Sequence, residues 1–93
     1  MKKVTLKNES WENEHHTLEA CLKDTGDLVL EGYDLGDSVK KYYGDSDYEY
    51  WHTVKAENVS DVLLQLIKDK FKSAREFLQW LEKKEIPYKS MSF

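Results

Sequence analysis

The apolar residues of this chain change their spacing near residue 55, and this change constrains the fold more than any other feature. Before that point, apolar and polar residues alternate along several short runs, a pattern typical of half-buried β-strands. After it, apolar residues recur every three or four positions, as in amphipathic helices. The sequence therefore predicts an α+β fold, in which two C-terminal helices pack on one face of a mostly antiparallel sheet. We expect one domain over residues 1–93, because a chain of this length leaves little room for two.

Period-two alternation predicts a sheet of four to five strands, over residues 3–7, 16–22, 28–33, 47–54 and, for a short last strand, 88–93. The segment KDTGD predicts a tight turn between the second and third strands, because Gly26 can take a positive φ angle. The segment NES predicts a turn after the first strand, and GDSD predicts the turn that leads into the fourth. Aromatic and β-branched residues fill the fourth strand, which we expect to be a central strand of the sheet.

Three helices are expected in the remaining segments. The segment DLGDSVKKYYG predicts a short helix after the third strand, with Asp34 or Asp37 as its cap and Gly44 at its end. Asn58 can cap a longer helix, and an S-x-x-E capping box that begins at Ser73 starts the last one. The apolar stripes that the two long helices would bury are Val59, Val62, Leu63, Leu66, Ile67 and Phe71, followed by Phe77, Leu78 and Leu81, with Trp80 as a further candidate.

The formal net charge of −4 is unevenly distributed along the chain. Residues 24–54 hold eight acids against Lys40 and Lys41, a net charge of −6, whereas residues 55–93 carry +2. The acidic segment would repel phosphate backbones, and Arg75 is the only arginine available for bidentate phosphate contacts. We therefore expect no nucleic acid partner, and a basic protein is the partner that complementary charge favours.

Two further features bear on the cellular location of the protein. No apolar run approaches the roughly 20 residues of a membrane-spanning helix, so we expect no membrane association. The single cysteine, Cys21, cannot form a disulfide within the chain, and on a strand we expect it to be a buried, unreactive thiol. These features predict a reduced, cytoplasmic setting.

Four segments of the chain, TGDLVLEGYDLG, YEYWHTV, DVLLQLIKDKF and EIPY, resemble a group of small bacterial proteins. The shared pattern is D-G-D-L-x-[IL]-x-G-x-D-L-G, then a YEY-containing strand and a C-terminal Ile-Pro step, over roughly residues 16–88. This chain departs from the pattern at Thr25, within the turn, and at Tyr33 before Asp34. Because the group has no established activity, the resemblance implies one bacterial domain and supplies no catalytic residues.

Familiar metal, cofactor and catalytic signatures are missing from the sequence, which contains no GxGxxG, P-loop, HExxH, CxxC or GxSxG motif. His15 and His16 are adjacent on a predicted strand and so point to opposite faces. Asp45, Asp47 and Glu49 occupy the first positions of a calcium-loop pattern, but the required Gly and final Glu are replaced by Tyr50 and Ala56. We therefore expect no metal and no cofactor.

The aromatic and acidic residues of the third and fourth strands give a stronger indication of function. Trp51 alternates onto the same face as Asp47 and Glu49, and the outward set of the third strand would contain Val29, Glu31 and Tyr33. The same alternation also allows the opposite orientation, which would place Tyr48 and Tyr50 outside. An aromatic patch rimmed by acids is typical of a protein-binding surface. The residues predicted to bind a partner are Glu31, Tyr33, Asp34, Asp47, Glu49 and Trp51.

These observations favour a small acidic interaction domain without catalysis, of which an immunity-type protein or an antitoxin would be a concrete form. One alternative is a small enzyme or ligand-binding domain that uses Glu31, Asp34, Glu49 and His52 in a pocket. Another is a homodimeric structural module, with an interface that covers Trp51.

Overall fold

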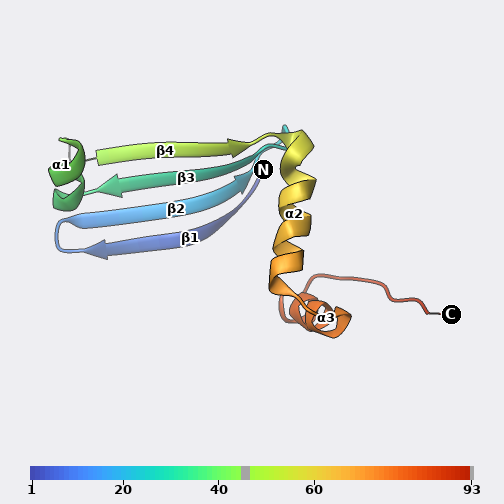
Figure 1. Ribbon diagram of the computed structural model, residues 1–93. Coiled ribbons are helices and arrows are strands. Elements are labelled where there is room, and N and C mark those ends of the chain that lie inside the picture. The colour runs from blue at the N-terminus through green and yellow to red at the C-terminus, as the bar shows by residue number, and fades with distance from the viewer. Residues whose placement is uncertain (45–46, 93) are drawn as a thin grey trace. The chain divides into compact units, whose positions relative to one another are not determined.

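The computed structural model describes residues 1–44 and 47–92. The elements follow in the order β1 (Lys2–Trp11), β2 (Glu14–Leu22), β3 (Leu28–Leu35), α1 (Asp37–Tyr43), β4 (Asp47–Val54), α2 (Ala56–Lys70) and α3 (Ala74–Lys83) (Figure 1). The fold is α+β, with an antiparallel four-strand sheet, a short helix after the third strand and two C-terminal helices, as the sequence predicts.

The chain forms two compact units, residues 1–60 and residues 61–93, and each is described by itself. The first unit contains the sheet, α1 and the first turn of α2, and the second contains the rest of α2, α3 and the C-terminal segment. The expectations of a single domain and of helices packed on the sheet stay predictions. Within the described residues, no helix has both the length and the apolar character needed to cross a bilayer.

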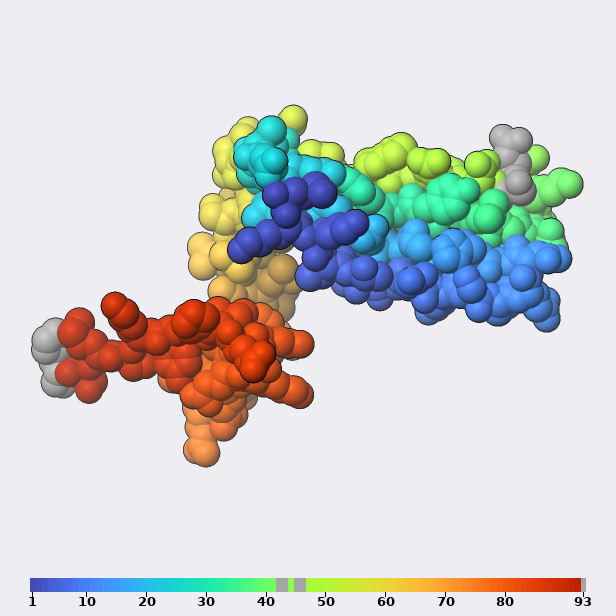
Figure 2. All heavy atoms as spheres, turned by 180° about the vertical axis from the view of Figure 1, so that it is seen from behind, coloured from blue at the N-terminus to red at the C-terminus, as the bar shows by residue number. Residues whose placement is uncertain are grey.

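The sheet is an antiparallel meander with the strand order β1-β2-β3-β4. In Figure 2, β1 in blue and β4 in yellow-green lie at its two edges. The prediction of a central fourth strand is therefore wrong, because among the described residues β4 pairs with β3 alone and lies at an edge of the sheet. Alternating aromatic residues indicate a strand, but the pattern does not distinguish an edge from the centre.

The first strand is longer than predicted, because the segment NES continues β1 instead of turning. Ser10 pairs with His15 and Trp11 with Glu14, so the chain reverses at residues 12–13, where Glu12 has a φ of 48°. Every residue of β1 is exposed, and an exposed edge strand tolerates this polar segment.

The turn between β2 and β3 is the one that KDTGD predicts. The Lys23 amide donates to the Asp27 carbonyl and the Gly26 amide to the Lys23 carbonyl, both at 2.9 Å, and Gly26 has a φ of 90°. The strands then pair without interruption from Leu22–Leu28 to His15–Leu35.

The registers assign the sheet residues to two faces, because successive side chains of a strand alternate. The Trp51 face, as we call it, carries Cys21, Val29, Glu31, Tyr33, Asp47, Glu49 and Trp51. The Leu30 face carries His16, Ala20, Leu28, Leu30, Asp34, His52 and Val54. His15 and His16 lie on opposite faces, as predicted.

Helix α1 begins differently from the prediction and ends as predicted. Its N-cap is Gly36, at a φ of 141°, instead of Asp34 or Asp37. The Ser38 amide donates to the Glu14 carboxylate at 3.1 Å, so an acid from β2 takes the place of a local cap. Gly44 closes the helix in the left-handed region.

Helix α2 begins at Ala56, two residues before the predicted cap Asn58. The Ala56 amide donates to Asp27 Oδ1 at 2.8 Å, so a carboxylate from the β2–β3 turn satisfies the first turn of the helix. The capping box of α3 is confirmed, because Ser73 Oγ accepts from the Glu76 amide at 3.2 Å. Residues 87–92 form no strand, so the predicted fifth strand is wrong for them, and Phe93 lies outside the described residues.

The buried apolar side chains of the described residues are few: Cys21, Val29, Val39 and Leu81. Cys21 and Val29 are direct cross-strand partners on the Trp51 face, so they form a buried pair on that side of the sheet. The predicted stripe of α2 is less buried than expected, since Leu63 and Leu66 are exposed.

Candidate functional site

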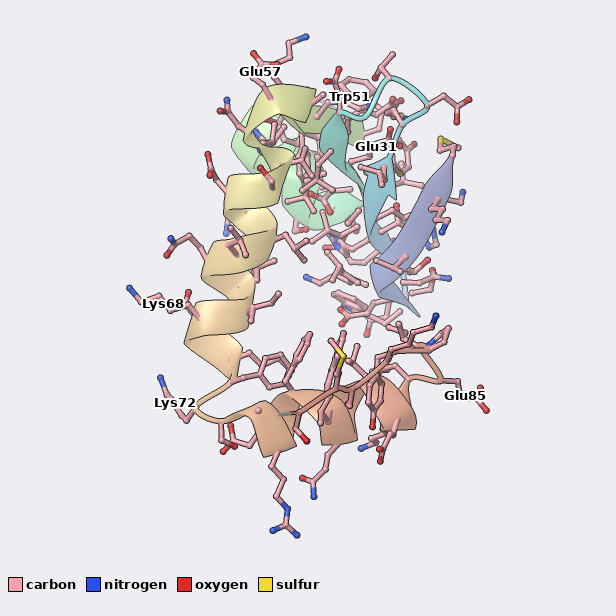
Figure 3. The ribbon with its side chains drawn as sticks, turned by 90° about the vertical axis from the view of Figure 1, so that its right-hand side faces the viewer. Glu31, Trp51, Glu57, Lys68, Lys72 and Glu85 are labelled. Carbon is pink, nitrogen blue, oxygen red and sulfur yellow. The ribbon has the colours of Figure 1, made fainter. Side chains whose placement is uncertain are left out.

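The candidate site lies on the Trp51 face, where the edge strand β4 meets β3. The register places Trp51 opposite Glu31, Glu49 opposite Tyr33 and Asp47 opposite Leu35. Figure 3 labels Glu31 and Trp51, which come from these two adjacent strands. The Trp51 side chain is 59% exposed, a high value for the largest apolar side chain, and Asp47 and Glu49 are exposed beside it.

The two acids of β4 carry the free negative charge of this surface. Within the described residues, neither Asp47 nor Glu49 forms an ion pair. An exposed carboxylate without a cationic partner is available to a cation on another molecule. Because Tyr33 lies directly opposite Glu49, the surface combines two free acids with two aromatic rings.

Glu31 belongs to the same face but is already paired. Lys23 Nζ lies 2.6 Å from Glu31 Oε1, and both side chains are about one-third exposed. The hydrogen bond from Lys23 is the main reason why the pKa of Glu31 lies below its ordinary value, and the same bond raises the pKa of Lys23. The carboxylate of Glu31 is therefore ionised and largely neutralised within the protein.

Asp34, the remaining residue of the predicted set, lies on the Leu30 face. Its Oδ1 atom lies 2.8 Å from Nδ1 of His16, its direct partner in the β2–β3 register. The structure therefore brings Glu31, Tyr33, Asp47, Glu49 and Trp51 together on one face and places Asp34 on the other.

Val29 does not belong to the outward surface either, because its side chain is only 7% exposed. It pairs with Cys21, which is a buried free thiol, as predicted. Cys21 and Val29 are buried, whereas Asp47, Glu49 and Trp51 are exposed, so the Trp51 face is buried near β2 and exposed along β4.

A second polar cluster, which the sequence reasoning missed, surrounds His16 on the Leu30 face. His16 Nδ1 contacts Asp34, Nε2 lies 3.5 Å from Glu14 Oε2, and the Trp11 ring stacks on the imidazole at 5.1 Å between centroids. Hydrogen bonding by Ser38 is the main reason why the pKa of Glu14 is lowered. Counting outward from the β2–β3 turn would have paired His16 with Asp34.

This cluster connects elements and is poorly arranged for catalysis. A histidine that acts as a general base needs one ring nitrogen free to face a substrate. Both nitrogens of His16 face carboxylates, and Trp11 covers one side of the ring. The cluster therefore joins β1, β2 and β3 to the first turn of α1, where Glu14 accepts from Ser38.

The residues named for a catalytic pocket are divided between the two faces of the sheet. Glu31 and Glu49 lie on the Trp51 face, whereas Asp34 and His52 lie on the Leu30 face. His52 does border a hollow of about 230 Å³, but its other lining residues are Ala20, Leu28, Leu30 and Val54, with no carboxylate among them.

Metal ligation has no support in the part of the chain that the structure describes, where no group of three or more His, Cys, Asp or Glu residues is placed to hold an ion. Asp45, the first residue of the calcium-loop pattern, lies outside the described residues, as does part of the predicted GDSD turn.

The C-terminal unit contains an apolar groove of about 760 Å³ between α2 and α3. Phe71 joins the two helices, because its ring makes edge contacts with Phe77 at 5.2 Å and with Trp80 at 5.7 Å. Leu63, Leu66 and Ile86 line the same groove and are exposed.

Comparisons of this chain with models of protein families, with curated protein sequences and with solved structures find no match.

Proposed function

We propose that the protein is a small, non-catalytic interaction domain that binds a basic protein through the β4 side of the Trp51 face. The observation that carries this proposal is the exposure of Trp51 beside the unpaired acids Asp47 and Glu49. Tryptophan and tyrosine are frequent among the residues that contribute most to protein interfaces, where desolvation strengthens their contacts. Charged groups at the rim of such a patch select partners of opposite charge.

The charge of the whole sheet unit supports the same type of partner. Residues 1–60 hold thirteen acids against seven lysines, a net charge of −6. Such a field accelerates the encounter with a basic protein at low ionic strength, and salt weakens it. An immunity-type protein or an antitoxin, whose acids occupy a basic site on a toxin, is the concrete form of this proposal.

Affinity capture from a lysate of the source organism tests the proposal at low and at moderate salt. The wild type is compared with a Glu49→Lys, Trp51→Ala double variant and with a control, Glu9→Lys, Val4→Ala, whose exposed residues lie on β1 and on the Leu30 face. We expect a salt-sensitive basic protein to be captured by the wild type and the control but not by the double variant. No captured protein, or equal capture by all three, would contradict the proposal.

A further inference from the structure

We propose that the partner binds by adding a strand to the outer edge of β4, as an extended segment that places lysine or arginine at alternate positions over the Trp51 face. This inference rests on the proposed function and specifies how the partner is recognised. Strand addition supplies affinity through main-chain hydrogen bonds, whereas the side chains on each face supply specificity.

The two edges of the sheet differ in how they oppose strand addition. The β1 edge carries Lys2, Lys3 and Lys7, and its register shifts between Thr5 and Lys7. Lysines and bulges are the devices by which natural sheets prevent pairing at an edge. The β1 edge is therefore protected.

The β4 edge has none of these devices. Its eight residues, DYEYWHTV, include no lysine and no proline, and they pair with β3 in an unbroken register from Asp47–Leu35 to Val54–Leu28. An edge strand presents alternate N–H and C=O groups on its outer side. Within the described residues, no strand pairs with that side of β4, which Figure 2 shows as the yellow-green border of the sheet.

The side chains of β4 determine the chemistry of the added segment. Asp47 and Glu49 are two residues apart on the same face, so their carboxylates are spaced by about 7 Å along the strand. Basic side chains at alternate positions of an added strand would match this spacing, because cross-strand neighbours of opposite charge stabilise each other. Trp51 continues the row and offers a ring face to an arginine or lysine.

A second copy of this chain fits the edge less well than a basic segment does. Each sheet unit carries a net charge of −6, so joining two of them at β4 would bring like charges together. An alternating basic segment removes this repulsion and neutralises the free acids.

Amide hydrogen exchange of the full chain, followed by NMR, tests strand addition with two synthetic peptides of equal charge. The probe is acetyl-Lys-Thr-Lys-Val-Lys-Thr-Lys-amide, and the control carries a methyl group on the backbone nitrogen of each lysine, which keeps the charge and removes the N–H groups that would bond β4. We expect the probe to slow the exchange of alternate β4 amides, with no effect on β1 amides. The control peptide should leave β4 exchange unchanged, and a Glu49→Lys, Trp51→Ala variant should lose most of the protection.

Failure of strand addition is distinguishable from failure of the proposed function. If both peptides shift the Glu49 and Trp51 signals equally and no β4 amide is protected, strand addition is wrong while the acidic surface stands. If neither peptide shifts these signals, both proposals are contradicted. A dimer in sedimentation, together with protection of β4 amides in the absence of peptide, would show that a second copy of the chain occupies this edge. The proposal of a basic segment would then be wrong.

Discussion

Lys23 and Glu31 form an ion pair at 2.6 Å that neutralises the acid directly opposite Trp51. Because Glu31 on β3 is paired, the free negative charge of the candidate surface belongs to Asp47 and Glu49 on the edge strand. From the sequence alone, Glu31, Asp47 and Glu49 are equivalent members of the predicted binding surface. The structure separates a paired acid, which stabilises the sheet, from two acids that are available to a partner.

Replacement of Lys23 with methionine tests this division through its pH dependence. Because the pKa of Glu31 is lowered by Lys23, the pair stabilises the fold fully above the ordinary glutamate value of 4.5, and this contribution is lost as the pH falls through the lowered pKa. The raised pKa of Lys23 maintains the contribution up to at least its ordinary value of 10.5. We expect Lys23→Met to lower the melting temperature at neutral pH and to match the wild type in acid, once the pH is below the lowered pKa of Glu31. A difference that persists unchanged in acid would show that Lys23 acts through packing alone.

Gly32 is predicted to tolerate no side chain while Tyr50 lies over it. A Cβ at position 32 would meet the Tyr50 ring at 2.0 Å, which forces the ring to move. We expect Gly32→Ala to reduce the free energy of unfolding by about 1–3 kcal/mol, as overpacking does. The cost should fall when Tyr50→Ala is present, and a double-mutant cycle measured by urea unfolding checks this coupling. Additive effects of the two changes would show that the ring does not cause the cost.

The thiol of Cys21 should be unreactive in the folded protein. Its side chain is 2% exposed, and a thiolate must reach the reagent before it can attack. We expect a chromogenic disulfide reagent to react slowly with the native protein and rapidly in denaturant. Equal rates in both conditions would place Cys21 on the surface.

Two leucines of the C-terminal unit provide a matched test of its small core. Leu81 is buried, whereas Leu64 is 61% exposed. Leu81→Ala should cost about 2–4 kcal/mol through lost burial and the cavity left behind. Leu64→Ala should cost about 0.5 kcal/mol or less, as exposed substitutions usually do. Thermal unfolding compares them, and equal losses would contradict the assignment of Leu81 to the core.

Local patterns predicted the elements of this fold well, because periodicity and turn chemistry act over a few residues. The β2–β3 turn, the left-handed Gly44 and the Ser73 cap all depend on near neighbours, and all are confirmed. The wrong caps have a common cause. Glu14 and Asp27 are distant in sequence from the helices whose first turns they satisfy, so no local pattern could indicate them.

The candidate site was predicted less completely, for a related reason. Alternation correctly placed Trp51 with Glu49 on one face, but it did not reveal that Val29 is buried there. The pairing of Glu31 with Lys23 depends on the geometry of a turn, and the edge position of β4 depends on strand order. The alternation of residues along a strand predicts neither the ion pair of Glu31 nor the edge position of β4.

Removal of the Trp51 side chain tests the central claim most directly, with Trp11→Ala as the matched control. Trp11 is also exposed, but its ring stacks on His16 and lies on the other face. Melting temperature and affinity for the captured basic protein are measured for both variants and the wild type. The account predicts that Trp51→Ala keeps the melting temperature and weakens binding about tenfold or more, which corresponds to about 1.4 kcal/mol, whereas Trp11→Ala lowers the melting temperature and keeps the affinity. A large loss of stability in Trp51→Ala with unchanged affinity would contradict the account and assign Trp51 to the structure of the sheet.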